Sequence, residues 1–232
     1  MKRKGFVYFA VIIVVVLLTL VLVGCGGNKS TEYDIVKMTK MDNYELLNET
    51  AQHNQVVFIG DSIIELYPTY ELFTGKNKRV YNRGISGDTS DRLLERMDKN
   101  ALNINPDIVY ILVGTNDIAK GREHSAIISN INNIIDKCKD KGVSKIIVSG
   151  LYPVNKSINS SMVGKRTNKE IIELNNKIES ATAQKNVLFS DLTAVLADSD
   201  GNFNKDYTYD GLHPNAKGYL EITKTLMPLI FD

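Results

Sequence analysis

The chain has 232 residues, of which 43% are apolar and 24% are charged, and its formal net charge is +1. This length suits one sizeable domain with a single core, and the composition is ordinary for a globular protein. A net charge so close to zero gives no indication of binding to nucleic acid, so we expect no such partner.

The first 24 residues have the pattern of an export signal. The basic residues Lys2, Arg3 and Lys4 precede an apolar run of 18 residues over 6–23, which is typical of a signal peptide or a membrane anchor. The run is just long enough for a transmembrane helix, so an uncleaved anchor stays an alternative. Because the basic start is held in the cytoplasm, both alternatives place the rest of the chain outside it.

Cys25 ends the stretch LVGC at 22–25, which resembles the lipobox of bacterial lipoproteins. That resemblance implies a signal peptide at 1–24, cleavage before Cys25, and lipid on this cysteine as the membrane anchor. Residues 25–54 would then be the lipidated N-terminus, a short polar tether and a leading helix. We therefore expect the protein on the cell membrane, lipid-anchored and facing outside the cytoplasm.

From residue 55 to the end at 232, short apolar runs alternate with helical patterns. The runs predict strands at 56–60, 79–84, 107–114, 145–150 and 187–191, and the patterns between them predict helices at 88–101, 122–141, 164–185 and 214–229. The run at 107–114 is apolar on both faces, as in a strand that helices cover on two sides. The alternation predicts one α/β domain over 55–232, with a five-stranded parallel sheet in a three-layer α/β/α arrangement.

The second cysteine, Cys138, lies on the apolar stripe of the helix predicted at 122–141. Its spacing is helical relative to Ile127, Ile128, Ile131, Ile134 and Ile135. We therefore expect Cys138 in the core and no disulfide.

Polar residues follow four of the predicted strands, and the loops at the carboxyl ends of parallel strands are where ligands bind. Each segment alone is more typical of a turn or a helix cap. Together they supply the residue types that one chemistry requires. In chain order they are Gly60-Asp61-Ser62, NRGISGDTSD at 82–91, GTND at 114–117 and YDGLHPNAKGY at 209–219.

A serine hydroxyl is a poor nucleophile at neutral pH and needs a base within hydrogen-bond reach. His213 is of the type that takes and returns a proton near neutrality. Asp210 precedes it by three residues, so its carboxylate could hold the imidazole in the required tautomer. We predict Ser62 as the nucleophile of a triad with His213 and Asp210, and Pro214 as the first residue of the final helix.

These segments, in this order and spacing, resemble the blocks of the GDSL/SGNH esterase superfamily over about residues 55–229. The Ser, Gly, Asn and His of that name are matched by Ser62, Gly87, Asn116 and His213, and the compact layout resembles the platelet-activating-factor-acetylhydrolase-like branch. The resemblance implies a flavodoxin-like SGNH fold. The backbone N–H groups of Ser62 and Gly87 are suited to binding an oxyanion, and the resemblance adds the Asn116 side chain as a third donor.

The predicted function is that of a lipid-anchored serine esterase acting outside the cytoplasm. By resemblance, short acyl groups such as acetyl are favoured, with a small ester or an acetylated glycan as substrate. The sequence has no His-Glu-x-x-His, no paired-cysteine ligand set and no phosphate-binding loop, so we expect neither a metal nor a cofactor. An acyltransferase on cell-envelope glycans and a non-catalytic binding lipoprotein stay as alternatives, and no oligomeric state is favoured.

Overall fold

A computed structural model describes residues 32–232, with side chains from residue 38 onward. The chain divides into two compact units, Met1–Thr39 and Lys40–Asp232. In the first unit only the start of helix α2 (Glu32–Leu47) is described. The predicted signal peptide and Cys25 lie outside the described residues. Within those residues, no helix is both long and apolar enough to span a membrane.

The second unit is built on a parallel sheet of five strands. These are β1 (Val56–Gly60), β2 (Val80–Gly84), β3 (Ile108–Leu112), β4 (Lys145–Ser149) and β5 (Leu188–Ser190), in the spatial order β2-β1-β3-β4-β5. Every neighbouring pair is parallel. The predicted α/β fold with a five-stranded parallel sheet is confirmed, and the strand ends differ from the predicted ones by at most two residues.

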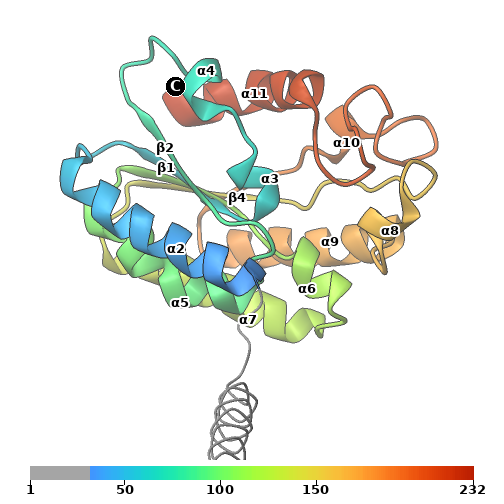
Figure 1. Ribbon diagram of the computed structural model, residues 1–232, viewed down its shortest axis with the longest axis horizontal. Helices are drawn as coiled ribbons and strands as arrows, with labels where there is room; N and C mark the ends of the chain where they lie inside the picture. The colour runs from blue at the N-terminus through green and yellow to red at the C-terminus, as the bar shows by residue number, and fades with distance from the viewer. Residues whose placement is uncertain (1–31) are drawn as a thin grey trace, which may run out of the picture. The chain divides into compact units, whose positions relative to one another are not determined.

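Helices cover both faces of the sheet (Figure 1). On one face lie α5 (Ser90–Asn100), α7 (His124–Asp140) and α9 (Asn168–Gln184); on the other lie α11 (Ala216–Phe231) and the short α4 (Thr69–Leu72) and α10 (Thr193–Leu196). The remaining described elements are short: η1 (Asn48–Thr50), α3 (Ser62–Glu65), η2 (Leu102–Ile104), α6 (Thr115–Ala119) and α8 (Ser160–Val163).

The central strand β3 shows how the two cores arise. Val109 and Ile111 pack in the core beneath α5, α7 and α9, whereas Ile108, Tyr110 and Leu112 pack in the core beneath α11. Alternate side chains of a strand point to opposite faces, so a strand buried on both sides must be apolar throughout. All five of these residues are buried, which explains why the run at 107–114 lacks polar alternation.

Cys138 lies in the core on the inner face of α7, as its spacing predicted. The thiol is free and buried. Burial raises the pKa of Cys138 to about 12, so its thiolate, the reactive form, is scarcely populated at neutral pH.

The strand order creates a topological switch point at the carboxyl end of the sheet. β1 lies between β2 and β3, so the chain leaves β1 toward one side and later returns to its other side. At such a switch point the loops after neighbouring strands diverge, and ligands bind between them. The segments after β1, β2 and β3 begin at residues 61, 85 and 113, and all three contain predicted site residues.

Candidate active site

Ser62 is the first residue of α3, directly after β1. Asp61 caps this helix: its Oδ1 accepts a hydrogen bond from Ile63 N at 3.0 Å. The first N–H groups of a helix have no carbonyl acceptor within it, so Ser62 N–H is available to a ligand. Because α3 has only four residues, its helix dipole is weak. The Ser62 N–H group itself therefore contributes most to the binding of a negatively charged atom at this end of the helix. Ser62 is partly exposed between buried neighbours.

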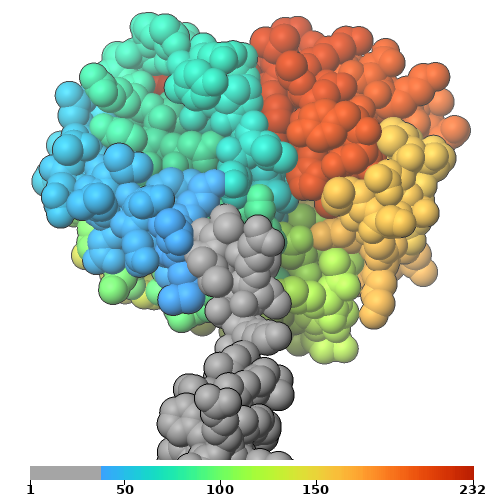
Figure 2. All heavy atoms as spheres, in the orientation of Figure 1, coloured from blue at the N-terminus to red at the C-terminus, as the bar shows by residue number. Residues whose placement is uncertain are grey.

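The structure brings Ser62, His213 and Asp210 into one hydrogen-bonded series. Ser62 Oγ lies 2.9 Å from His213 Nε2, and His213 Nδ1 lies 2.7 Å from Asp210 Oδ2. A carboxylate can only accept, so Nδ1 carries the proton and Nε2 is free to accept the Ser62 hydroxyl proton. The turquoise segment after β1 and the red C-terminal segment lie side by side on the face shown in Figure 2.

The turn at 208–213 holds the imidazole in place. Asp210 Oδ1 accepts from the backbone N–H groups of Leu212 and His213 at 2.9 and 2.7 Å. Burial alone would raise the pKa of Asp210, but these bonds and the one from the His213 ring hold it below its usual range. Gly211 has φ +79°, and a Cβ there would lie 2.1 Å from Asn155 O. Only glycine fits this turn.

The prediction that Pro214 begins the final helix is wrong. Asn215 is the N-cap of α11, with its side chain accepting from Gly218 N at 3.0 Å, and Ala216 is the first helical residue. Pro214 instead pairs with Thr208 in an isolated antiparallel bridge. The Asn215 side chain satisfies an orphan N–H of the first turn, so the helix begins two residues later than predicted.

Gly87 lies in the loop after β2 with φ +74°, a left-handed conformation that glycine adopts without strain. The adjacent Ser86 N donates to Glu65 Oε2 at 2.5 Å. Glu65 also pairs with Lys40 of α2. The loop that carries Gly87 is therefore attached both to the helix that begins with Ser62 and to the leading helix.

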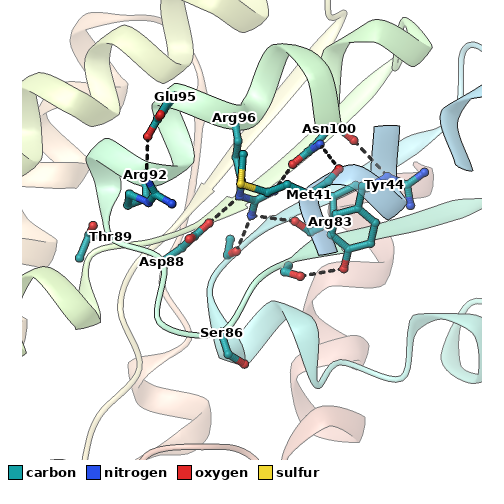
Figure 3. A network of polar contacts seen from close by, with 12 residues as sticks. Met41, Tyr44, Arg83, Ser86, Asp88, Thr89, Arg92, Glu95, Arg96 and Asn100 are labelled. Atoms are coloured by element: carbon teal, nitrogen blue, oxygen red, sulfur yellow. Dashed lines mark hydrogen bonds and ion pairs between the residues drawn. The ribbon is translucent and has the colours of Figure 1, made fainter. Parts of the chain in front are cut away.

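The residue after Gly87 is held by a buried arginine. Arg96 Nε lies 2.5 Å from Asp88 Oδ2, and its Nη2 donates to Gly60 O and Arg83 O at 3.1 and 2.9 Å. Figure 3 shows the guanidinium pointing from α5 toward Asp88. Both side chains of the pair are almost fully buried. Arg96 thus ties the ends of β1 and β2 to the loop between β2 and α5.

Asn116 is in α6, directly after β3. Its Nδ2 donates to Asp88 O at 3.0 Å, and its Oδ1 accepts from Arg166 Nη2 at 2.8 Å. Asn116 is partly exposed, whereas Thr115 before it and Asp117 after it are buried. The structure therefore connects Asn116 to the loop that carries Gly87, the other residue predicted with it as an oxyanion donor.

A buried carboxyl group, that of Asp61, directly precedes Ser62, the predicted nucleophile. Burial raises the pKa of Asp61 to about 7; the Ile63 N–H and Arg166 oppose the rise, and Asp88 and Asp117 add to it. Its Oδ2 has no hydrogen-bond partner among the described residues. No group of three or more metal-ligating side chains occurs within the described part of the chain.

Three residues of this site were not found from the sequence. Arg96 had a signal: it lies between Leu93 and Met97 on the buried stripe of α5, and a charge on an apolar face indicates a partner. Glu65 and Arg166 had none, because a charged residue in a loop or a short helix is ordinary on its own.

A serine, a histidine and a carboxylate in hydrogen-bonded series at the switch point of a parallel sheet define a serine hydrolase on an α/β scaffold. The model of the GDSL-like lipase/acylhydrolase family matches residues 58–220, and the chain belongs to this family. It is a serine ester hydrolase of the GDSL type, as expected from its segments.

Individual relatives agree with this assignment. The chain is 31% identical over 181 residues to platelet-activating factor acetylhydrolase IB subunit alpha2 of Rattus norvegicus, with 76% of each chain covered. A protein of Streptococcus pneumonia described as a candidate platelet activating factor is 32% identical with a TM-score of 0.78, covering 84% of this chain and 92% of its own. A GDSL-like lipase of Bacteroides thetaiotaomicron is 25% identical with a TM-score of 0.74, covering 82% and 96%.

Proposed function

We propose that this protein hydrolyses short acyl esters through an acyl-enzyme formed on Ser62, with His213 as general base and Asp210 orienting the imidazole. The observation that supports this most is the series Ser62 Oγ to His213 Nε2 at 2.9 Å and His213 Nδ1 to Asp210 Oδ2 at 2.7 Å. Nucleophile, base and orienting acid are each within hydrogen-bond distance of the next.

In the first half-reaction, Ser62 Oγ attacks the ester carbonyl while its proton passes to His213 Nε2. The imidazolium that forms is stabilised by Asp210. The tetrahedral intermediate then collapses, its alcohol leaves with the proton from His213, and an acyl-Ser62 ester remains. In the second half-reaction, water attacks the acyl group while His213 Nε2 takes its proton. The second tetrahedral intermediate then collapses, the bond between the acyl carbon and Ser62 Oγ breaks, and His213 returns the proton to Ser62 Oγ as the acid leaves.

The negative oxygen of each tetrahedral intermediate is bound by the N–H groups of Ser62 and Gly87 and by Nδ2 of Asn116. Each donor follows a different one of the three neighbouring strands β1, β2 and β3, which supports their convergence at the carboxyl end of the sheet. Preorganised donors of this kind stabilise charge that develops only in the transition state, which is why they increase the rate.

The substrate class is a small ester or an acetylated glycan, with acetyl as the acyl group. The support is the family and the likeness to relatives named as acetylhydrolases. Partial exposure of Ser62 and His213 leaves the reacting atoms open to an ester on a larger molecule.

The catalytic assignment is tested with p-nitrophenyl esters and a fluorophosphonate probe. Ser62→Ala is expected to lower kcat by about 10⁴- to 10⁶-fold and to abolish labelling, whereas Ser125→Ala, on the exposed start of α7, leaves both unchanged. We expect kcat/KM for acetate to exceed that for octanoate. Retained labelling in Ser62→Ala would refute the nucleophile, and a preference for octanoate would refute the short acyl group. Products measured with and without a sugar acceptor separate hydrolysis from acyl transfer.

We further propose that the protein is exported and anchored by lipid on Cys25, on the basis of the sequence pattern at 1–25. In cells fed radiolabelled palmitate, wild type and Cys138→Ala are expected to carry label in the membrane fraction. Cys25→Ala is expected to lose the label, because Cys138 is buried in the core and cannot replace it. An unlabelled, full-length chain in the membrane would instead indicate an uncleaved anchor.

A further inference from the structure

Arg166 places its guanidinium against the residues that carry the third oxyanion donor. It lies between α8 and α9 and is 6% exposed. Its Nε donates to both Thr115 O and Thr115 Oγ1 at 2.9 Å, and its Nη2 donates to Asn116 Oδ1 at 2.8 Å. Its Nη1 donates hydrogen bonds to Met162 O and Val163 O at 3.3 and 3.1 Å. Residues of α8 therefore hold the other side of the guanidinium.

These bonds determine which way the Asn116 amide points. A guanidinium has donors only, so the atom of Asn116 that faces Arg166 must be the carbonyl oxygen. The atom that faces Asp88 O, 3.0 Å away, must then be the amide nitrogen. A flipped amide would lose both bonds and would turn its oxygen toward a developing negative charge.

We infer that Arg166 is a positioning residue that holds Asn116 in the orientation required to bind the oxyanion; this inference rests on the proposed function. One N–H of Asn116 Nδ2 donates a hydrogen bond to Asp88 O, and the second N–H is the one that would donate to the oxyanion of the substrate. The cationic partner on Oδ1 also draws electron density from the amide and makes its N–H a stronger donor. Arg166 touches no reacting atom and acts through Asn116.

The inference is tested by a double-mutant cycle between Arg166 and Asn116, with stability followed by thermal unfolding. Arg166→Met keeps an unbranched side chain comparable to the aliphatic stem of arginine and removes the donors, and is expected to lower kcat by about 10- to 100-fold, with KM changed by less than about twofold. In the Asn116→Ala background, Arg166→Met is expected to leave kcat within about twofold of the kcat of Asn116→Ala alone. The matched control is Arg92→Met, because Arg92 pairs with Glu95 on the exposed side of α5.

Each result of the cycle has a distinct meaning. If the losses from Arg166→Met and Asn116→Ala multiply, or if Arg166→Met keeps wild-type kcat, Arg166 does not act through Asn116 and the inference is overturned. If Asn116→Ala itself keeps wild-type kcat, the proposed oxyanion site fails instead. Should Arg166→Met not fold, Arg166→Lys replaces it in the same cycle. Lysine keeps the charge, but its single nitrogen cannot bridge Thr115, Asn116 and α8 as the guanidinium does. Multiplied losses, or a wild-type kcat in Arg166→Lys, would again overturn the inference.

Discussion

Replacing Arg96 with methionine is expected to lower the free energy of unfolding by about 3–5 kcal/mol. The guanidinium pairs with Asp88 at 2.5 Å in a site where both side chains are at most 1% exposed. Removing the cation would leave the Asp88 carboxylate in low dielectric, and would also leave Gly60 O and Arg83 O without this donor. The cost arises mainly from the buried carboxylate that has lost its cation and from the lost hydrogen bonds, because the pair itself contributes little net stability after desolvation.

The same substitution is expected to lower kcat, since Asp88 follows Gly87 and its carbonyl accepts from Asn116. Urea unfolding at neutral pH measures the stability change. Arg92→Met is the matched control, because that arginine lies four residues earlier on α5 and its exposed pair with Glu95 is worth about 0–1 kcal/mol. Asp88→Asn in the Arg96→Met background should recover part of the loss by removing the buried negative charge. A loss of less than about 1 kcal/mol in Arg96→Met would contradict the assignment of a buried charge pair.

The strands could be predicted closely because each is a short apolar run, rich in residues that favour strands, whose length matches a buried strand. Val56–Gly60 was predicted to the residue, and the helix of Cys138 had a stripe of isoleucines at the correct spacing. The start of the final helix was harder to predict. Pro214 and Asn215 both suit a helix start, and only the bridge between Pro214 and Thr208 decides between them.

The candidate site could be predicted where the residue type itself carries chemistry. Ser62, His213 and Asn116 follow strands and are chemically distinctive, so their convergence follows from the parallel topology. Arg166 is different. Its partners Thr115 and Asn116 lie about fifty residues earlier in the chain, and nothing local to 164–167 indicates that contact. Positioning residues depend on tertiary geometry, which single-sequence patterns do not contain.

Asp61 is expected to make the stability of the domain fall as pH rises from about 4 to about 7. Burial raises the pKa of Asp61 to about 7, from 3.8 when unfolded. Below pH 3.8 both states carry the proton. Between the two values the unfolded chain releases it and the folded chain keeps it, so unfolding becomes easier by about 1.4 kcal/mol for each pH unit, up to about 4 kcal/mol in all. Above pH 7 both states are ionised and the effect is constant.

Asp61→Asn is the test, because asparagine keeps an oxygen to cap Ile63 N and cannot ionise. Any fixed cost of the new amide is the same at each pH, so the quantity to compare is the difference in unfolding free energy between variant and wild type, measured from pH 4 to pH 8. The unfolding free energy of Asp61→Asn should rise relative to that of wild type up to about pH 7, and the difference should then stay constant. Asp210, whose pKa is lowered, contributes stability that is lost only below about pH 4 and lies outside this window. A difference that does not change with pH would mean that Asp61 ionises in the folded state as it does in the unfolded one. The carboxyl before Ser62 would then be charged at neutral pH, and Arg166, the cation that opposes the rise in its pKa, would be its counter-ion as well as a partner of Asn116.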